Sequence, residues 1–205
     1  MIIHPRIYLV SQSPRRRDLL KQIGVSFEVL LLRADPRRKP DVDETPHPNE
    51  PPEDYVMRVS QAKAHAGLAT MGFRNLPQFP VLAADTTVTL DGKILGKPMD
   101  REEAVDMLRQ LSGRQHRVLT AVAVAFDDRV EVRMTDTAVT FATLSEERIR
   151  RYVLTNEPHD KAGAYGIQGM AGAFVARIEG SYSGVVGLPL AETVELLQLF
   201  GYPAP

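Results

Sequence analysis

Short apolar runs rich in β-branched residues recur along the chain and are typical of buried strands. The first, Ile7 to Val10, ends directly before a polar turn, and another, Val81 to Ala84, ends at Asp85. We expect Asp85 to lie where its strand leaves the sheet, and Thr86 to Leu90 to begin a hairpin around Asp91-Gly92. The predicted strands are 7–10, 27–32, 81–84, 86–90, 93–95, 118–126, 130–141 and 174–178.

Between these runs, apolar residues recur at helical spacing, which predicts amphipathic helices. The first has Ser13 as its N-cap, Pro14 at its first position and Gly24 beyond its end. Asp100 with Glu103 forms a capping box for a later helix. The predicted helices, with their caps, are 13–24, 55–71, 100–111, 145–154 and 190–200, and 33–52 is a predicted loop. Because strands and helices alternate, we expect an α/β fold with a mixed twisted sheet and flanking helices.

Composition narrows the class of protein. Cysteine is absent, which excludes disulfides and thiolate catalysis. No apolar run approaches the roughly 20 residues of a membrane-spanning helix, and the first residues show no secretory signal, so we expect a cytoplasmic protein with no membrane partner. The net charge of -1 argues against a nucleic-acid-coating surface, so a local cluster of cations must meet any anionic ligand.

One such cluster follows the first strand, in the segment Ser11-Gln12-Ser13-Pro14-Arg15-Arg16. A helix N-terminus offers free backbone N–H groups and a partial positive charge, and arginines match phosphate oxygens. Cations in the first helical turn oppose the helix dipole, and a bound polyphosphate would compensate for this. The alternative is an ordinary helix start with solvated arginines. The segment is not a Walker loop, because no Gly-Lys-Ser/Thr follows a glycine-rich turn.

Two carboxylates are candidates for metal binding or proton transfer. Asp85 follows an apolar strand, and ligands of open α/β sheets bind outside strand ends. There it could hold a divalent metal or take a proton from an attacking water. Glu44, in an acidic loop, is a second candidate metal ligand. The alternatives are a turn-capping Asp and a solvated loop Glu.

Three lysines and one amide complete the candidate chemistry. A nucleoside triphosphate carries about four negative charges, so several cations and a metal must converge on it. Lys63, Lys97 and Lys161 are candidates, although each alone is more typical of a solvated surface. Gln168 lies among alternating glycines and carries a donor and an acceptor, which suit the N3–H and O4 edge of uracil or thymine. Its alternative is a polar residue of a glycine-rich turn.

The order and spacing of these motifs resemble the Maf family of nucleotide pyrophosphatases from Ile7 to Gly201. The matching blocks are Ser11-x-Ser13-Pro14-Arg15-Arg16, Asp43-Glu44, Arg58, Lys63-Ala64, Ala84-Asp85-Thr86, Leu95-Gly96-Lys97-Pro98, Leu111-Ser112-Gly113 with His116, Asp160 to Gly169, Gly180-Ser181-Tyr182 and Val186 to Leu190. The resemblance implies a single Maf-like domain over residues 1–205, similar to inosine triphosphate pyrophosphatase. It further implies two lobes around a nucleotide-binding cleft, a divalent metal (Mg²⁺ or Mn²⁺) and a homodimer.

The resemblance also implies roles for individual residues. Asp85 matches the family's proton acceptor, and with Glu44 it would contact the metal. Lys63 and Lys97 would assist catalysis. The residues expected to bind the nucleotide are Ser13, Arg15, Arg16, Thr86, Lys161 and Gln168, with Arg16, Thr86 and Gln168 tied to base choice.

The segment Ala164 to Gly169 is similar to the branch that acts on dTTP and UTP, which implies house-cleaning of normal or modified pyrimidine nucleotides. Alternatives are the same chemistry on 7-methyl-GTP or another base, and a non-catalytic nucleotide-binding regulator of cell division. A nucleic-acid-binding protein is a further alternative, disfavoured by the few aromatic residues. Two features depart from the family pattern: Gly184, in place of a larger polar residue, and the Arg37-Arg38-Lys39 run with its Pro-rich loop.

Overall fold

The computed structural model describes residues 4–33, 40–155 and 157–205. The chain divides into two compact units, which we describe separately. The first consists of Met1–Asp85, Thr120–Met134 and Gly187–Pro205, and the second of Thr86–Leu119 and Thr135–Val186. The unusual basic run at 37–39 lies outside the described residues. Among the described residues, no helix has the length and apolar character needed to cross a membrane.

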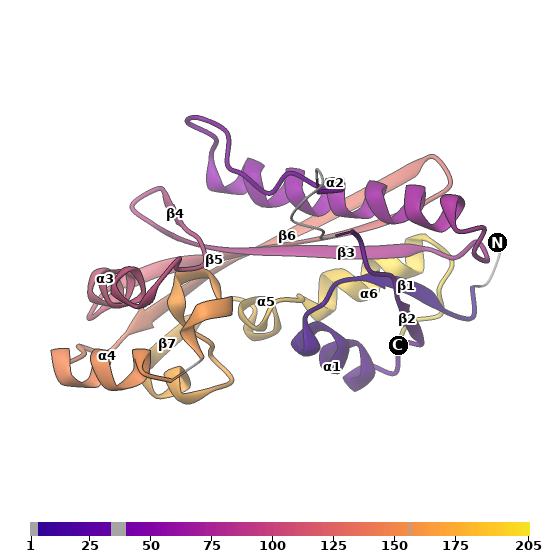
Figure 1. Ribbon diagram of the computed structural model, residues 1–205. Coiled ribbons are helices and arrows are strands. Elements are labelled where there is room, and N and C mark those ends of the chain that lie inside the picture. Colours follow the sequence, from indigo (N-terminus) through magenta and orange to yellow (C-terminus); the bar gives the residue numbers. More distant parts are fainter. Residues whose placement is uncertain (1–3, 34–39, 156) are drawn as a thin grey trace. The chain divides into compact units, whose positions relative to one another are not determined.

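One mixed sheet has the strand order β2-β1-β3-β5-β6-β7, and β4 pairs with β3 (Figure 1). β1 pairs parallel with β2 and β3, whereas β4 is antiparallel to β3 and β7 to β6. The strands are β1 (Ile7–Val10), β2 (Phe27–Val29), β3 (Val81–Leu90), β4 (Lys93–Leu95), β5 (Gln115–Phe126), β6 (Arg129–Phe141) and β7 (Val175–Glu179). The helices are α1 (Pro14–Gln22), α2 (Pro52–Phe73), α3 (Arg101–Leu111), α4 (Glu146–Val153), α5 (Tyr182–Val186) and α6 (Leu190–Leu199), with short 3-10 turns η1 (Pro158–Asp160), η2 (Ala162–Ala164) and η3 (Met170–Phe174).

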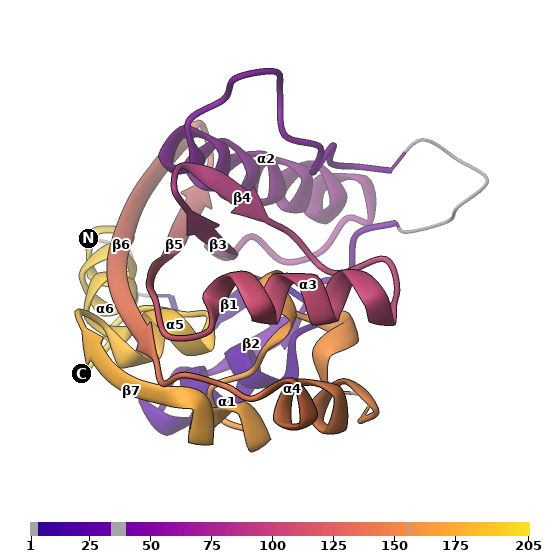
Figure 2. The ribbon, with the colours of Figure 1, turned by 90° about the vertical axis from the view of Figure 1, so that its left-hand side faces the viewer.

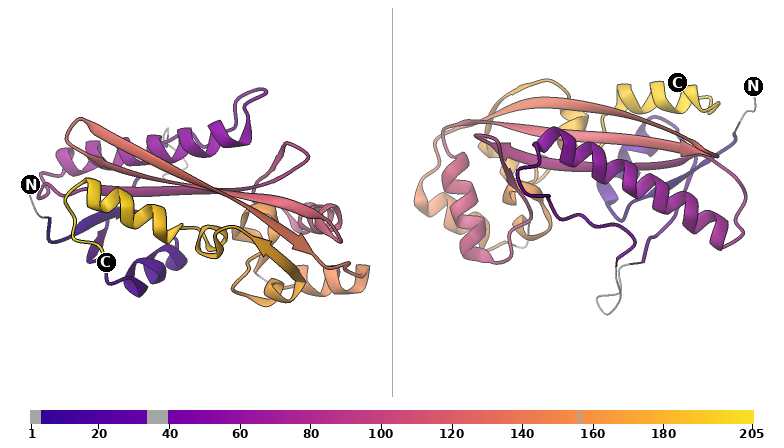
Figure 3. Two further views of the ribbon diagram at one scale, coloured as in Figure 1. Left: turned by 180° about the vertical axis from the view of Figure 1, so that it is seen from behind. Right: turned by 90° about the horizontal axis from the view of Figure 1, so that it is seen from above.

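In the first unit, α2 covers one face of the sheet, and α1 and α6 lie on the other (Figures 1 and 3). Ala64 and Met71 of α2 pack into one apolar cluster with Val81 and Ala83 of β3. A Cβ on Gly67 would lie 2.6 Å from methyl groups of Val10 and Val81. Glycine at this position therefore lets α2 approach β1 and β3 closely.

Local signals account for the start and end of α1. The Ser13 hydroxyl accepts a hydrogen bond from the backbone N–H of Arg16, and Pro14 occupies the first helical position. Gly24 follows the helix with φ +67°, the left-handed conformation that glycine adopts without steric cost. The predicted first helix is thus confirmed together with its caps.

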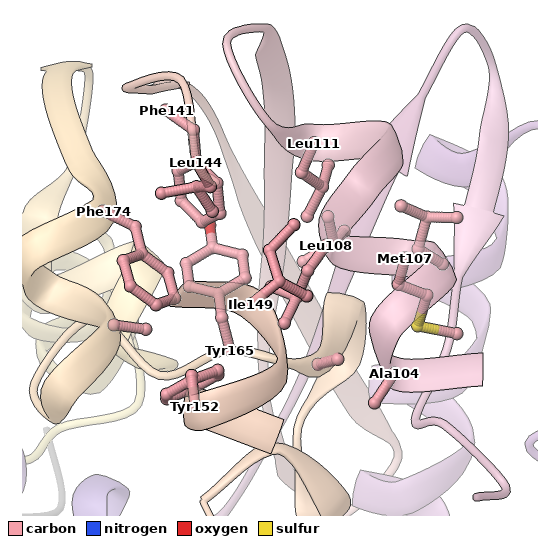
Figure 4. Packing of buried hydrophobic residues seen from close by; sticks show 14 of the residues in the cluster. Ala104, Met107, Leu108, Leu111, Phe141, Leu144, Ile149, Tyr152, Tyr165 and Phe174 are labelled. Carbon is pink, nitrogen blue, oxygen red and sulfur yellow. The ribbon is translucent and has the colours of Figure 1, made fainter. Parts of the chain in front are cut away.

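The second unit has its own core, built around Tyr165 (Figure 4). The Tyr165 ring contacts Phe141 and His116 edge-on, and its hydroxyl lies 2.7 Å from Nε2 of His116. Helices α3 and α4 lie side by side in this unit (Figure 2). Their leucine and isoleucine side chains, Leu108, Leu111 and Ile149, are fully buried in the same cluster.

Several predicted boundaries change. The expectation that Asp85 lies at a strand end is wrong, because β3 runs without a break from Val81 to Leu90 and places Asp85 in mid-strand. Thr87 and Thr89 are only 2% exposed, so these β-branched residues continue the buried strand. β2 is shorter than predicted and ends at Val29. The Asp91-Gly92 hairpin is confirmed, with Leu90 opposite Lys93.

Candidate active site

Strand register brings the polar turn after β1 close to Asp85 in the first unit. Val10, the last residue of β1, pairs with Ala83, so Ser11 leaves the sheet beside the residues that follow Ala83. Side chains two residues apart in a strand point to the same face. Asp85 therefore shares the face of Val81 and Ala83, which α2 covers.

Lys63 of α2 joins two carboxylates from separate segments. Its Nζ donates to Oδ1 of Asp85 at 2.8 Å and to Oε2 of Glu44 at 2.9 Å. The side chains of Lys63 and Asp85 are 14% and 10% exposed, whereas that of Glu44 is 54% exposed. One carboxylate is thus held inside the unit and the other at its surface, with one ammonium between them.

The loop that carries Glu44 is fastened to α2 through its backbone. The Tyr55 hydroxyl donates to the carbonyl oxygen of Glu44 at 3.0 Å. Arg58, one turn along α2, donates to the carbonyl oxygens of Asp43 and Thr45 at 3.4 and 3.1 Å. The loop was predicted from its composition, but these contacts were not, because Tyr55 marked only the apolar face of the helix.

Glu50 anchors Arg58 in turn. Nε and Nη2 of Arg58 donate to the two carboxylate oxygens of Glu50 at 2.6 and 2.8 Å, a bidentate pair. The Arg58 hydrogen bonds lower the pKa of Glu50 to about 2, so its carboxylate stays ionised at neutral pH. The pair therefore keeps the guanidinium directed at the Glu44 loop.

Arg16 belongs to the same charged group. Its Nε donates to the carbonyl oxygen of Gly187 at 2.7 Å, and its Nη1 donates to Oγ of Ser11 at 3.4 Å. Burial lowers the pKa of the Arg16 guanidinium. The negative charges of Asp85 and Glu44 act in the opposite direction and offset part of this lowering. An arginine keeps its proton under such shifts, so Arg16 adds a fixed positive charge to the cluster.

Burial, followed by the charges of Asp85 and Glu44, raises the pKa of Tyr55 to about 12. The phenol thus remains a hydrogen-bond donor at neutral pH.

We call Arg16, Glu44, Lys63 and Asp85 the charged cluster. Arg15 is partly exposed in the first turn of α1.

The remaining predicted residues lie in the second unit. Thr86 is partly exposed in β3, and Lys97 is exposed in the segment between β4 and α3. That segment touches the glycine-rich stretch, because the N–H of Gly163 donates to the carbonyl oxygen of Gly96 at 3.0 Å. The Lys161 ammonium donates to Oδ1 of Asp160 and to the carbonyl oxygen of Glu157, both at 2.5 Å. Gln168 is exposed.

Both carboxylates of the charged cluster offer oxygen ligands, the type that Mg²⁺ and Mn²⁺ prefer. Among the described residues, no group of three or more His, Asp or Glu side chains could hold a metal alone. Two carboxylates nevertheless fit a magnesium ion that takes its other ligands from water and phosphate. The residues present therefore fit the metal that the family resemblance implies.

Fold and cluster together define an α/β protein whose first unit gathers two cations and two carboxylates beside a helix N-terminus, a site suited to a phosphate ligand. The sequence matches the family model described as Maf-like protein over residues 6–200. The chain belongs to this family.

Curated relatives match over nearly their full length. A "dTTP/UTP pyrophosphatase" of Aromatoleum aromaticum is 56% identical over 98% of both chains. Proteins of the same name from Nitrosomonas europaea and Dechloromonas aromatica are 55% and 51% identical, over 95% and 96% of this chain and 94% and 98% of theirs. A structure titled "The structure of the Staphylococcus aureus Ham1 protein" covers 95% of this chain and 97% of its own, at a TM-score of 0.48 and 16% identity.

Proposed function

We propose that this chain is a nucleoside triphosphate pyrophosphatase that hydrolyses dTTP and UTP to the monophosphate and pyrophosphate. The proposal draws on the relatives named dTTP/UTP pyrophosphatase, which are 51–56% identical to this chain. The structural observation that carries it is the ammonium of Lys63, placed between Glu44 and Asp85. Removal of such nucleotides is a house-cleaning activity. We propose that the protein carries it out in the cytoplasm as a homodimer.

In the proposed reaction, a water oxygen attacks the α-phosphorus and the bond from this phosphorus to the β-bridging oxygen breaks, so that pyrophosphate leaves. Asp85 accepts the proton of the attacking water. Lys63 holds Oδ1 of that carboxylate, and the other oxygen, Oδ2, is the proposed proton acceptor. The fixed hydrogen bond orients Asp85 before the substrate arrives.

Glu44 and Asp85 would hold the divalent cation. When bound, Mg²⁺ or Mn²⁺ neutralises negative charge on the phosphate oxygens. Arg16, Arg15 and the capped N-terminus at Ser13 would take further phosphate charge, because a helix N-terminus and guanidinium groups both favour anions. Roles of Lys97 and Lys161 in binding phosphate, and of Thr86 and Gln168 in base choice, remain predictions from the family resemblance.

The first experiment measures pyrophosphate and inorganic phosphate separately with dTTP, UTP, CTP, GTP and 7-methyl-GTP. Each substrate is tested with Mg²⁺, with Mn²⁺ and with a chelator. We expect metal-dependent release of pyrophosphate, fastest with dTTP and UTP. Release of inorganic phosphate instead would contradict attack at the α-phosphorus, and a preference for another base would contradict the pyrimidine assignment.

Asp85→Asn is the decisive variant, and Asp91→Asn is its matched control. Loss of a general base costs roughly a hundredfold to ten-thousandfold in rate, so Asp85→Asn should lose nearly all turnover. Asp91 lies in the exposed hairpin turn with φ +52°, a conformation that Asn also tolerates. Near-normal turnover by Asp85→Asn would remove this residue from the mechanism. A folded wild-type protein that hydrolyses none of the five substrates would instead favour the nucleotide-binding regulator.

A further inference from the structure

Gln168 lies at the tip of a tight turn in the second unit. The N–H of Gly169 donates to the carbonyl oxygen of Gly166 at 3.0 Å, which closes a four-residue turn with Gln168 in its third position. The Gln168 side chain is exposed, so the direction of its amide depends on how this turn is held.

The carboxylate of Glu157 holds the residues that follow the turn. Its Oε2 accepts from the N–H of Met170 at 2.9 Å, and its Oε1 accepts from the N–H of Ala171 at 3.4 Å. Oε1 also accepts from the hydroxyl of Tyr152, in α4, at 3.0 Å. Burial raises the pKa of Tyr152, and the charge of Glu157 raises it further, so the hydroxyl remains a donor. The end of the turn is thereby tied to Tyr152, whose ring lies in the core cluster (Figure 4).

The glycines of the turn allow these contacts. A Cβ on Gly169 would lie 2.3 Å from both carboxylate oxygens of Glu157, and a Cβ on Gly166 would lie 2.6 Å from Cε of Lys161. Lys161 in turn donates to the carbonyl oxygen of Glu157. Glu157 packs against the end of the turn and Lys161 against its beginning, and the two residues are hydrogen-bonded to each other.

We propose that Glu157 is a positioning residue for base selection, which holds the turn so that the Gln168 amide meets the edge of uracil or thymine. The inference rests on the proposed function, because that function gives Gln168 a base to read. Gln168 offers a donor for O4 and an acceptor for N3–H, whereas cytosine presents the reverse pattern. A site built to pair with such groups discriminates only while its own groups are held in place.

The test compares kcat/KM for dTTP and dCTP in Glu157→Ala, Gln168→Ala and the double variant. We expect Glu157→Ala to reduce the dTTP/dCTP ratio by about tenfold or more, toward the ratio of Gln168→Ala. In the double variant the ratio should equal that of Gln168→Ala. Glu147→Ala is the matched control, since Glu147 is exposed on α4 and pairs with Arg151. Its ratio should be that of the wild type.

A purely structural role of Glu157 would lower kcat/KM for both nucleotides by one factor and leave the ratio unchanged, and this result would overturn the inference. Amide hydrogen exchange provides a second measurement that does not depend on activity. Faster exchange at Gly169, Met170 and Ala171 in Glu157→Ala supports the proposal that Glu157 holds the turn, and unchanged exchange overturns it. A wild-type protein that hydrolyses no triphosphate would refute the proposed function itself, while amide exchange would still decide whether Glu157 holds the turn.

Discussion

Lys63 donates a hydrogen bond to Asp85 across 2.8 Å, and the two residues are separated by 22 positions in the chain. Both side chains are largely buried, so each charge relies on the other for compensation. The same ammonium reaches Glu44 on the outer side. Replacing Lys63 would therefore leave two carboxylates of equal sign facing each other without a cation between them.

Lys63→Met should lower kcat/KM for dTTP by about a hundredfold or more, because a preorganised charge beside the reacting groups is lost. Lys93→Met is the control, since Lys93 is exposed in the hairpin strand β4 and should leave the rate unchanged. Steady-state kinetics on both variants, with folding checked by circular dichroism, tests the expectation. Equal rates for the two variants would contradict a role for the bridging ammonium.

Gly67→Ala should destabilise the protein by about 1–3 kcal/mol, because its Cβ would overlap Val10 and Val81 where α2 meets the sheet. Gly72→Ala, in the same helix, meets no atom within 4 Å and should be neutral or stabilising by about 0.5–1 kcal/mol. Denaturant unfolding of both variants measures the difference. If both variants were equally stable, the close approach of α2 would not depend on Gly67.

His116 should make stability depend on pH. The residue is 2% exposed, and burial lowers its pKa from 6.5 to about 4 in the folded protein. The unfolded chain therefore binds more protons between these two values, and stability falls as pH falls from about 6.5 to 4. The loss should approach about 3 kcal/mol.

Unfolding curves of wild type and His116→Gln across this pH range test the effect. Glutamine can still contact the Tyr165 hydroxyl but does not titrate. The difference in unfolding free energy between the two proteins should change across the window. Parallel curves would show that another group causes any acid sensitivity.

Arg58→Lys should loosen the loop that carries Glu44. Lysine keeps the charge but cannot reproduce the bidentate pair with Glu50 or reach both backbone carbonyls. Cleavage after Glu44 by a glutamyl endopeptidase should become about tenfold faster, as expected when charged hydrogen bonds are lost. Arg114→Lys is the control, because Nη2 of Arg114 donates to both carboxylate oxygens of Asp91 at an exposed turn. An unchanged cleavage rate in Arg58→Lys would mean that the loop is held by other contacts.

The parts of the fold that depend only on residues close together in the sequence could be predicted. The caps at Ser13, Asp100 and Ser145 are confirmed, because each side chain bonds a backbone N–H three residues later. The position of Asp85 within its strand was not predictable from a local pattern. A charged residue after an apolar run resembles a strand end, and only burial of the following threonines shows that the strand continues.

The candidate site, like the fold, could be predicted from the sequence only in part. Family resemblance pointed to Glu44, Lys63 and Asp85, but spacing alone could not show that one ammonium joins them, since they come from three separate segments. Tyr55 and Glu157 were missed. The glycine at 169 was a signal for close approach, but not for the carboxylate of Glu157 that fills the space.

The structure shows why a small residue suits position 184, where the family resemblance predicts a larger polar one. A Cβ at this position would lie 2.6 Å from Oγ1 of Thr135, and the backbone N–H of Gly184 bonds Oγ of Ser181. Thr135 occupies the space that a larger side chain would need. The smaller residue at 184 and the threonine at 135 are therefore mutually consistent in this chain.

The formal charges of the charged cluster cancel, because Arg16 and Lys63 are positive and Glu44 and Asp85 negative. Taken by themselves, these four charges give a lone divalent cation or a lone triphosphate little net attraction. The chelate of the two would bring both signs at once, the cation to the carboxylates and the phosphates to the ammonium and guanidinium of the proposed site. Cation and nucleotide should therefore increase each other's affinity by one common factor, a reciprocity that any linked pair of ligands must obey.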